Sequence, residues 1–216
     1  MNKRKKDHIP KRDIMYAVNK NDSVYIINED YFYKTEPYYT IVQNEFQGIR
    51  TVPSSGDVLD AYIVPICLEK AKMAGISVCE WVISYSYVTL PAIVYGLNYF
   101  STPSDHFVVN DYPSAKKVIR HVTNFGKYPF CYQKMSSGSE IETYVSIFGK
   151  TVNSSPEVAS MSEKIYSVFQ IPLVTIVLVR DGGGYYLSSL APVRYSQLTR
   201  EETELLQSFL ETRVNH

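Results

Sequence analysis

The segment between residues 173 and 190 constrains the fold more than any other part of the sequence. Leu173 to Val179 is the most apolar run of the chain, and Asp181-Gly-Gly-Gly184 separates it from a second run, Tyr185 to Leu190. Glycine supplies the positive φ angles that tight turns between strands require. The pattern therefore predicts two antiparallel strands joined as a β-hairpin, the first of them buried.

Further strands and helices are predicted on both sides of this hairpin. Two capping boxes, Ser160 to Glu163 and Thr199 to Glu202, mark helix starts, and apolar residues at helical spacing follow each one. Gly75 stands where a glycine ends a helix, and Pro113-Ser114 is a helix-start pattern. Helices are predicted over residues 66–74, 114–124 and 160–169, and from Thr199 onward. Strands are predicted over residues 24–28, 38–43, 58–65, 76–84, 92–95, 128–134, 141–148, 173–179 and 185–190, with a Gly149-Lys150 turn pairing 141–148 with Thr151-Val152.

This order of elements predicts a mixed α/β (α+β) protein. In residues 58–100, helix, glycine and apolar strand follow one another as they do in a βαβ unit, so we expect a small Rossmann-like parallel layer there. An antiparallel, hairpin-rich sheet packed with helices should follow. We divide the chain into a basic arm, residues 1–22, an α/β layer, residues 23–105, and an α+β part, residues 106–216, packed on the same core.

The composition is that of a globular protein. Of the 216 residues, 45% are hydrophobic and 20% charged, and no apolar run approaches the roughly 20 residues that a membrane span needs. Cys67, Cys79 and Cys131 match no zinc or redox spacing. We therefore expect reduced thiols, a cytoplasmic location and no association with membranes.

Charge is distributed unevenly along the chain. The net charge is zero, but residues 1–12 hold six basic residues against Asp7, which gives +5 and leaves −5 for the remainder. Such an arm could attract nucleic acid, and some of the 19 tyrosines could stack on bases. The alternatives are a solvated chain end and tyrosines that fill half-buried strands. The basic residues of the arm are Lys3, Arg4, Lys5, Lys6, Lys11 and Arg12.

Few side chains form a pattern that catalysis would require. The chain has neither of the glycine-rich phosphate-binding motifs that lead into helices. Asp105 and His106, together with Asp111, could form a small polar site or simply belong to a solvated loop. Cys131, with His121 ten positions before it, could be an activated thiolate or an inert thiol buried in a strand.

Residues 129–152 resemble a stretch of the ATP-grasp ligases. A strand ending in Gln133-Lys134 precedes the strand from Glu140 and the Gly149-Lys150 turn, and a helix, an apolar strand, a glycine turn and a partner strand follow. This order of parts is similar to that family and covers about half of the chain. The resemblance implies an ATP-grasp-like fold for the C-terminal part, and it makes Gln133 and Lys134 candidate ligand-binding residues.

The chain departs from the family at the positions that would hold magnesium. ATP-grasp ligases use an acidic residue on the apolar strand and an acid-x-Asn pair on its partner, because magnesium prefers oxygen ligands. Here Leu173 to Val179 contains no acid, Ser188 and Leu190 replace the pair, and Lys134 replaces the acid expected after Gln133.

The missing carboxylates lead us to predict a degenerate, non-catalytic protein without a metal or cofactor. Its role would be to bind or to scaffold another protein or a second copy of itself. Two alternatives stay open. One is a nucleic-acid-associated protein that uses the basic arm, and the other is an enzyme with an unrecognised site at Asp105 and His106 or at Cys131 and His121.

Overall fold

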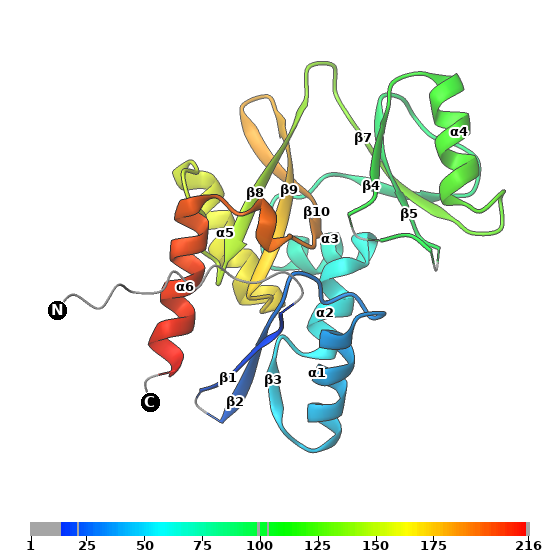
Figure 1. Cartoon of the computed structure of the whole chain (residues 1–216). Helices are drawn as coiled ribbons and strands as arrows, with labels where there is room; N and C mark the ends of the chain where they lie inside the picture. Colours follow the sequence, from blue (N-terminus) through cyan, green and yellow to red (C-terminus); the bar gives the residue numbers. More distant parts are fainter. Residues whose placement is uncertain (1–13, 21, 99, 103, 215–216) are drawn as a thin grey trace.

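The structure is a computed structural model that describes residues 14–20, 22–98, 100–102 and 104–214. These described residues form three sheets and their helices. Figure 1 shows the sheet β8-β9-β10 at the centre, the sheet that packs against α4 beyond one end, and the small sheet β1-β2-β3 with α1 at the other side. The mixed α/β fold class predicted from the sequence is confirmed.

The N-terminal part contains a parallel strand pair. Strand β2 pairs antiparallel with β1 and parallel with β3, and helix α1 forms the crossover between β2 and β3. The small parallel layer therefore exists, but it lies within residues 16–52 rather than 58–100. The elements of this part are β1 (Tyr16–Lys20), β2 (Ser23–Ile27), α1 (Glu36–Phe46), β3 (Arg50–Val52), α2 (Ser55–Tyr62) and α3 (Val64–Met73).

Two predicted strands in this part are helices. Residues 38–43 lie in α1, which has a proline in its first turn and buries Ile41; the tyrosines there suggested a strand because of their β-propensity. Residues 58–65 belong to α2 and the start of α3. A capping box formed by Ser54 and Asp57 begins α2, with Asp57 N 3.1 Å from Ser54 Oγ.

The second sheet has the order β4-β7-β5-β6 and is antiparallel throughout. Phe130 and Tyr132 of β7 pack toward α4, whereas Cys131 faces the main core on the other side. Helix α4 is capped by Asp111, not by Ser114. The elements of this part are β4 (Trp81–Ser84), β5 (Ala92–Gly96), β6 (His106–Val109), α4 (Tyr112–Val122) and β7 (Phe130–Lys134).

The third sheet contains the predicted hairpin, β9 and β10, which is confirmed. The pairing of residues 141–148 with 151–152 is wrong, because β8 pairs along its length with β9. The predicted capping box at Thr199 is present, with Glu202 N 3.2 Å from Thr199 Oγ1, whereas α5 begins earlier than predicted, after the cap Ser155. The elements of this part are β8 (Glu140–Ile147), α5 (Pro156–Phe169), β9 (Leu173–Asp181), β10 (Gly184–Ala191), the 3-10 turn η1 (Tyr195–Gln197) and α6 (Arg200–Val214).

One continuous apolar core connects the sheets. It takes Ile26 from β2, Ile93 and Cys131 from the second sheet, and Ile176 from β9, together with buried faces of α2, α3 and α5. Burial of this apolar surface is the main force that holds the sheets together. Among the described residues, no helix combines the length and apolar character needed to cross a bilayer.

Candidate functional site

A polar cleft of about 970 Å³ lies where the three sheets approach one another. One face of the sheet β8-β9-β10 forms its floor. Its walls come from the residues after β2, from the loop that leads into β6, and from the segment between β10 and α6. Because segments far apart in the sequence meet there, a cleft of this kind is the default candidate for a binding site.

Two cross-strand rows make up the floor of the cleft. Thr175 of β9 lies opposite Val145 of β8 and Ala191 of β10. Val177, two residues further along β9, lies opposite Thr143 and Ser189. Residues directly opposite each other point to the same side of a sheet. The floor therefore presents hydroxyl and aliphatic groups and no carboxylate. Five residues of the two rows line the cleft, namely Thr143, Val145, Thr175, Val177 and Ala191, whereas Ser189 is 0% exposed and lies beneath it.

Four carboxylates stand on the walls of the cleft, and each accepts a hydrogen bond from a backbone N–H. Glu29 accepts from Tyr195 N, and Asp30 accepts from Phe32 N at 2.8 Å. The other two are Asp105, which accepts from Thr102 N at 3.2 Å, and Glu202, which accepts from Thr199 N at 2.8 Å.

These bonds show that the carboxylates hold turns and a helix start in place. Burial raises the pKa of Asp30, although the bond from Phe32 N opposes that rise. Among the described residues, no three His, Cys, Asp or Glu side chains gather closely enough to hold a metal ion.

Gln133 belongs to a buried network that ties the second sheet to the third. Its Nε2 donates to the Ser188 carbonyl at 2.7 Å, and its Oε1 accepts from Ser188 Oγ at 2.6 Å. The Tyr95 hydroxyl lies 2.6 Å from Ser188 Oγ and 3.2 Å from Ser189 Oγ. Gln133, Ser188 and Ser189 are each 0% exposed. The polar ends of these side chains are therefore occupied by one another.

A family model described as "RimK-like ATPgrasp N-terminal domain" matches residues 108–209, slightly less than half of the chain. Solved structures of ATP-grasp proteins are similar to this chain, and these include the following three. The D-alanine–D-alanine ligase from Helicobacter pylori is 13% identical, with a TM-score of 0.60 over 81% of this chain and 65% of that one. A RimK-domain ATP-grasp protein from Sphaerobacter thermophilus is 13% identical, with a TM-score of 0.60 over 79% and 73%. The ATP-grasp ligase PsnB is 11% identical, with a TM-score of 0.54 over 93% and 86%.

The chain has an ATP-grasp-like fold. The resemblance noted in the sequence is thereby confirmed at the level of fold. The chain spans less than two thirds of the length of the Helicobacter pylori ligase. No curated protein matches it in sequence.

The ATP-grasp-like chain brings some of the predicted site residues together and separates others. Asp105 and His106 both line the cleft. Asp111 caps α4, where its carboxylate accepts from Ser114 N at 2.8 Å, and it is not among the residues of the cleft. Lys134 is exposed at the end of β7, and Gln133 beside it is enclosed in the network. The arm residues Lys3, Arg4, Lys5, Lys6, Lys11 and Arg12 lie outside the described residues.

The possible Cys131–His121 pair does not form. Cys131 faces the main core on one side of the second sheet, and α4, which carries His121, packs on the other side. Burial raises the pKa of Cys131 to about 12, and His121 is exposed against Phe107. A base on the opposite face cannot deprotonate the thiol.

Sequence reasoning missed Glu29, Asp30 and Tyr95. The two acids directly follow β2, at the carboxyl end of a strand that pairs in parallel with β3. Ligand sites in open α/β sheets gather at such strand ends, so an acidic pair after a predicted strand was a usable signal. Tyr95 carries no comparable signal, because its role depends on contacts with β10.

The raised pKa of Cys131 predicts how stability depends on pH. A thiol whose pKa is higher in the folded state than its unfolded value of about 8.5 supports folding fully below that pH, and this support is lost as pH rises toward 12. Replacing Cys131 with alanine should therefore make the alkaline loss of stability shallower, by about 1 kcal/mol per pH unit. Urea unfolding between about pH 7.5 and 10.5 measures the slope. An unchanged slope would show that this thiol does not titrate as proposed.

Proposed function

We propose that this chain is a non-catalytic ATP-grasp-like protein whose role is to bind a partner. The observation that carries the proposal is the floor of the cleft, where both cross-strand rows present hydroxyls and aliphatic side chains. PsnB, which has a similar fold, was solved with Mg and ADP. A magnesium ion bound to a nucleotide needs hard oxygen ligands, carboxylates above all.

The groups that this chain offers do not fit such an ion. Hydroxyls of Thr143 and Thr175 are neutral, weaker ligands than carboxylates, and within the described part of the chain the Asp and Glu side chains of the walls do not gather in a group of three that could hold a metal ion. No step of phosphoryl chemistry is therefore assigned to this cleft.

The structure corrects the two positions on β10, Ser188 and Leu190, that the sequence aligns with the acid-x-Asn pair of the family. A β-bulge between Leu187 and Ser189 shifts the register of β10. Ala191 consequently lines the cleft, whereas Leu190 is part of the main core. The departure from the family pattern remains, because neither set of residues contains an acid.

Three exposed apolar side chains on α3 and at its start support a partner-binding role. Ile63, Ile66 and Met73 lie along α3 and its start, and they are 37%, 44% and 87% exposed. Exposed apolar side chains are buried in contacts between proteins when they belong to a contiguous patch. We propose that a partner protein or a second copy of the chain covers these three side chains.

The decisive experiment asks whether magnesium changes the response to ATP. Thermal melting of the full chain should show no stabilisation by ATP that depends on Mg²⁺. The reason is that a ligand stabilises only the state that binds it. Incubation with ATP, Mg²⁺ and a mixture of amino acids should release no ADP above the rate in buffer. An active ATP-grasp ligase in the same assays is the control, and magnesium-dependent stabilisation or ADP release would refute the proposal.

A further inference from the structure

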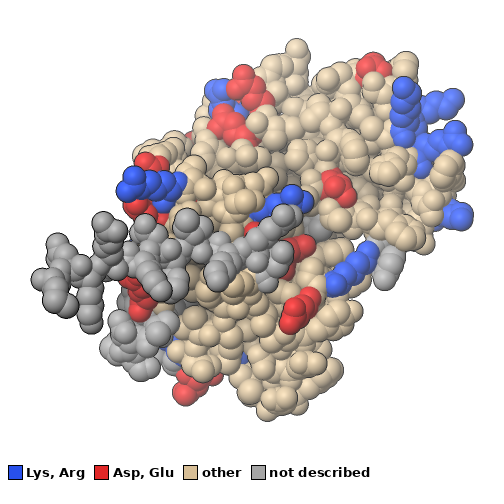
Figure 2. Space-filling view, in the orientation of Figure 1, with Lys and Arg blue, Asp and Glu red and all other residues tan. Residues whose placement is uncertain are grey.

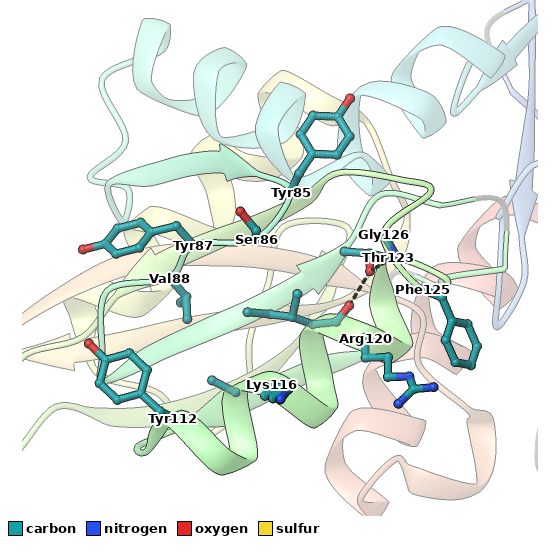
Figure 3. Close-up of a pocket in the computed structure, with 12 residues that line it drawn as sticks. Tyr85, Ser86, Tyr87, Val88, Tyr112, Lys116, Arg120, Thr123, Phe125 and Gly126 are labelled. Atoms are coloured by element: carbon teal, nitrogen blue, oxygen red, sulfur yellow. Dashed lines mark hydrogen bonds between the residues drawn. The ribbon is translucent and has the colours of Figure 1, made fainter.

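A second concave surface lies on the outer side of the sheet β4-β7-β5-β6, away from the cleft. The loop after β4 and helix α4 enclose a groove of about 470 Å³ (Figure 3). Its floor is apolar, with Val88 3% and Ala115 2% exposed. Exposed rings stand around it, namely those of Tyr85, Tyr87, Tyr112 and Phe125, at 61%, 63%, 71% and 69% exposure.

The rings are arranged along the groove rather than in one cluster. In Figure 3, Tyr87 and Tyr112 lie near one end, and Phe125 lies with Arg120 at the other. The Arg120 guanidinium is 4.5 Å from the centre of the Phe125 ring. A second groove of about 410 Å³ continues past this pair and shares Arg120 and Phe125 with the first. We call the two grooves together the α4 surface.

The α4 surface carries more positive than negative side chains, although residues 13–216 as a whole carry −5. Lys116, Lys117 and Arg120 line the two grooves against one acidic residue, Asp105 of the second groove. Figure 2 shows Lys and Arg gathered over α4. The first groove is lined by Lys116 and Arg120 and by no acidic residue. Within the described residues, neither of these two cations forms a salt bridge.

We propose that the α4 surface binds single-stranded nucleic acid. Successive bases can stack on exposed aromatic rings while lysine and arginine contact the phosphates, and such binding needs no sequence-specific contacts. This inference goes beyond the proposed function, since it concerns grooves that share only Asp105 with the cleft, and none of the residues argued to bind lines the cleft.

The shape of the surface favours this ligand over two others. A bilayer is too flat to reach the buried floor formed by Val88 and Ala115. An acidic peptide would satisfy Lys116 and Arg120 but would leave the aromatic rings without flat partners. Unpaired bases match both features, whereas the bases of a duplex are already stacked on one another.

The test measures binding of the full chain to a fluorescein-labelled oligothymidylate of about 12 nucleotides by fluorescence anisotropy. Tyr87→Ala should weaken binding about 10-fold, because one stacking platform is lost. Tyr87→Phe keeps the ring and should bind like the wild type. Arg120→Ala should weaken binding and lower the salt slope by about 0.7, since one phosphate contact disappears. Lys72→Ala, which removes an exposed lysine of α3, is the matched control and should change neither quantity.

Other outcomes would overturn the inference. Undetectable binding would do so, as would equal affinity of the wild type and Tyr87→Ala. Loss of binding on deletion of residues 1–12 combined with no effect of the ring variants would assign the binding to the arm alone. If polyglutamate displaced the labelled oligonucleotide as effectively as unlabelled oligonucleotide does, the ligand of the α4 surface would be an acidic protein instead. Binding to phosphatidylserine vesicles that depends on Tyr87 would point to a membrane.

Discussion

Replacing Gln133 with alanine should lower the free energy of unfolding by about 4 kcal/mol. The side chain is 0% exposed and makes two hydrogen bonds to Ser188, which is itself 0% exposed. Alanine would leave the Ser188 carbonyl and hydroxyl without these partners in a place that water does not reach, at a cost of about 1–3 kcal/mol for each buried group. It would also leave a cavity between the second and third sheets.

Chemical denaturation measures this effect, and two further variants locate it. Gln43→Ala, on the exposed face of α1, is the matched control and should change stability by less than about 0.5 kcal/mol. Tyr95→Phe removes only the hydroxyl that reaches Ser188 and Ser189, and should cost about 1 kcal/mol. A loss below about 1 kcal/mol for Gln133→Ala would mean that the network does not hold the sheets together.

The Gln133 network also shows what the sequence can and cannot reveal. The resemblance to ATP-grasp ligases drew attention to Gln133 as a candidate ligand, and the fold that it implied is present. The sequence gives no sign that Gln133 would instead meet Ser188, which is 55 residues away along the chain. Its position depends on how two sheets dock, and local patterns do not encode such docking.

Local signals predicted the elements whose boundaries are fixed by local chemistry. The glycine turn of the β9–β10 hairpin and the capping box at Thr199 were both found where the sequence places them. The β-propensity of Tyr38 and Tyr39 predicts a strand where α1 lies, yet Glu36-Pro37 provides a helix start and Ile41 is buried. The tertiary contact of Ile41 outweighs the propensity of its neighbours.

The sequence predicts which groups the candidate site lacks, but not how the site is arranged. The sequence shows that Leu173 to Val179 contains no acid, and the residues of this run that reach the floor of the cleft are Thr175 and Val177. The sequence does not predict the bulge in β10, which places Ala191 rather than Leu190 at the cleft. A bulge adds one residue to a strand, so each residue after it points to the face opposite to the one that simple alternation predicts. The alternation of side chains along β10 therefore fails to predict their faces after Leu187.

The three cysteines should be almost inert toward thiol reagents in the folded protein. Cys67 and Cys131 are 0% exposed and Cys79 is 8% exposed, and burial raises the pKa of all three, to about 12 for Cys79 and Cys131. At about pH 8, only about 10⁻⁴ of such a thiol is ionised, against about a quarter of a thiol with the ordinary pKa of about 8.5. Since the thiolate is the reacting species, labelling should be at least about 1,000-fold slower than that of an exposed cysteine.

An aromatic disulfide reagent measures this difference directly. The matched reference is Ser137→Cys, which places a thiol in the exposed loop between β7 and β8. The variant should consume one equivalent of reagent rapidly through the introduced thiol, while the three native thiols should react only after denaturant is added. Rapid labelling of Cys131 in the folded wild type would contradict the burial described here and would restore this residue as a candidate nucleophile. Slow labelling instead leaves the chain without an activated thiol at Cys131, because neither solvent nor the imidazole of His121 reaches that sulfur across the sheet.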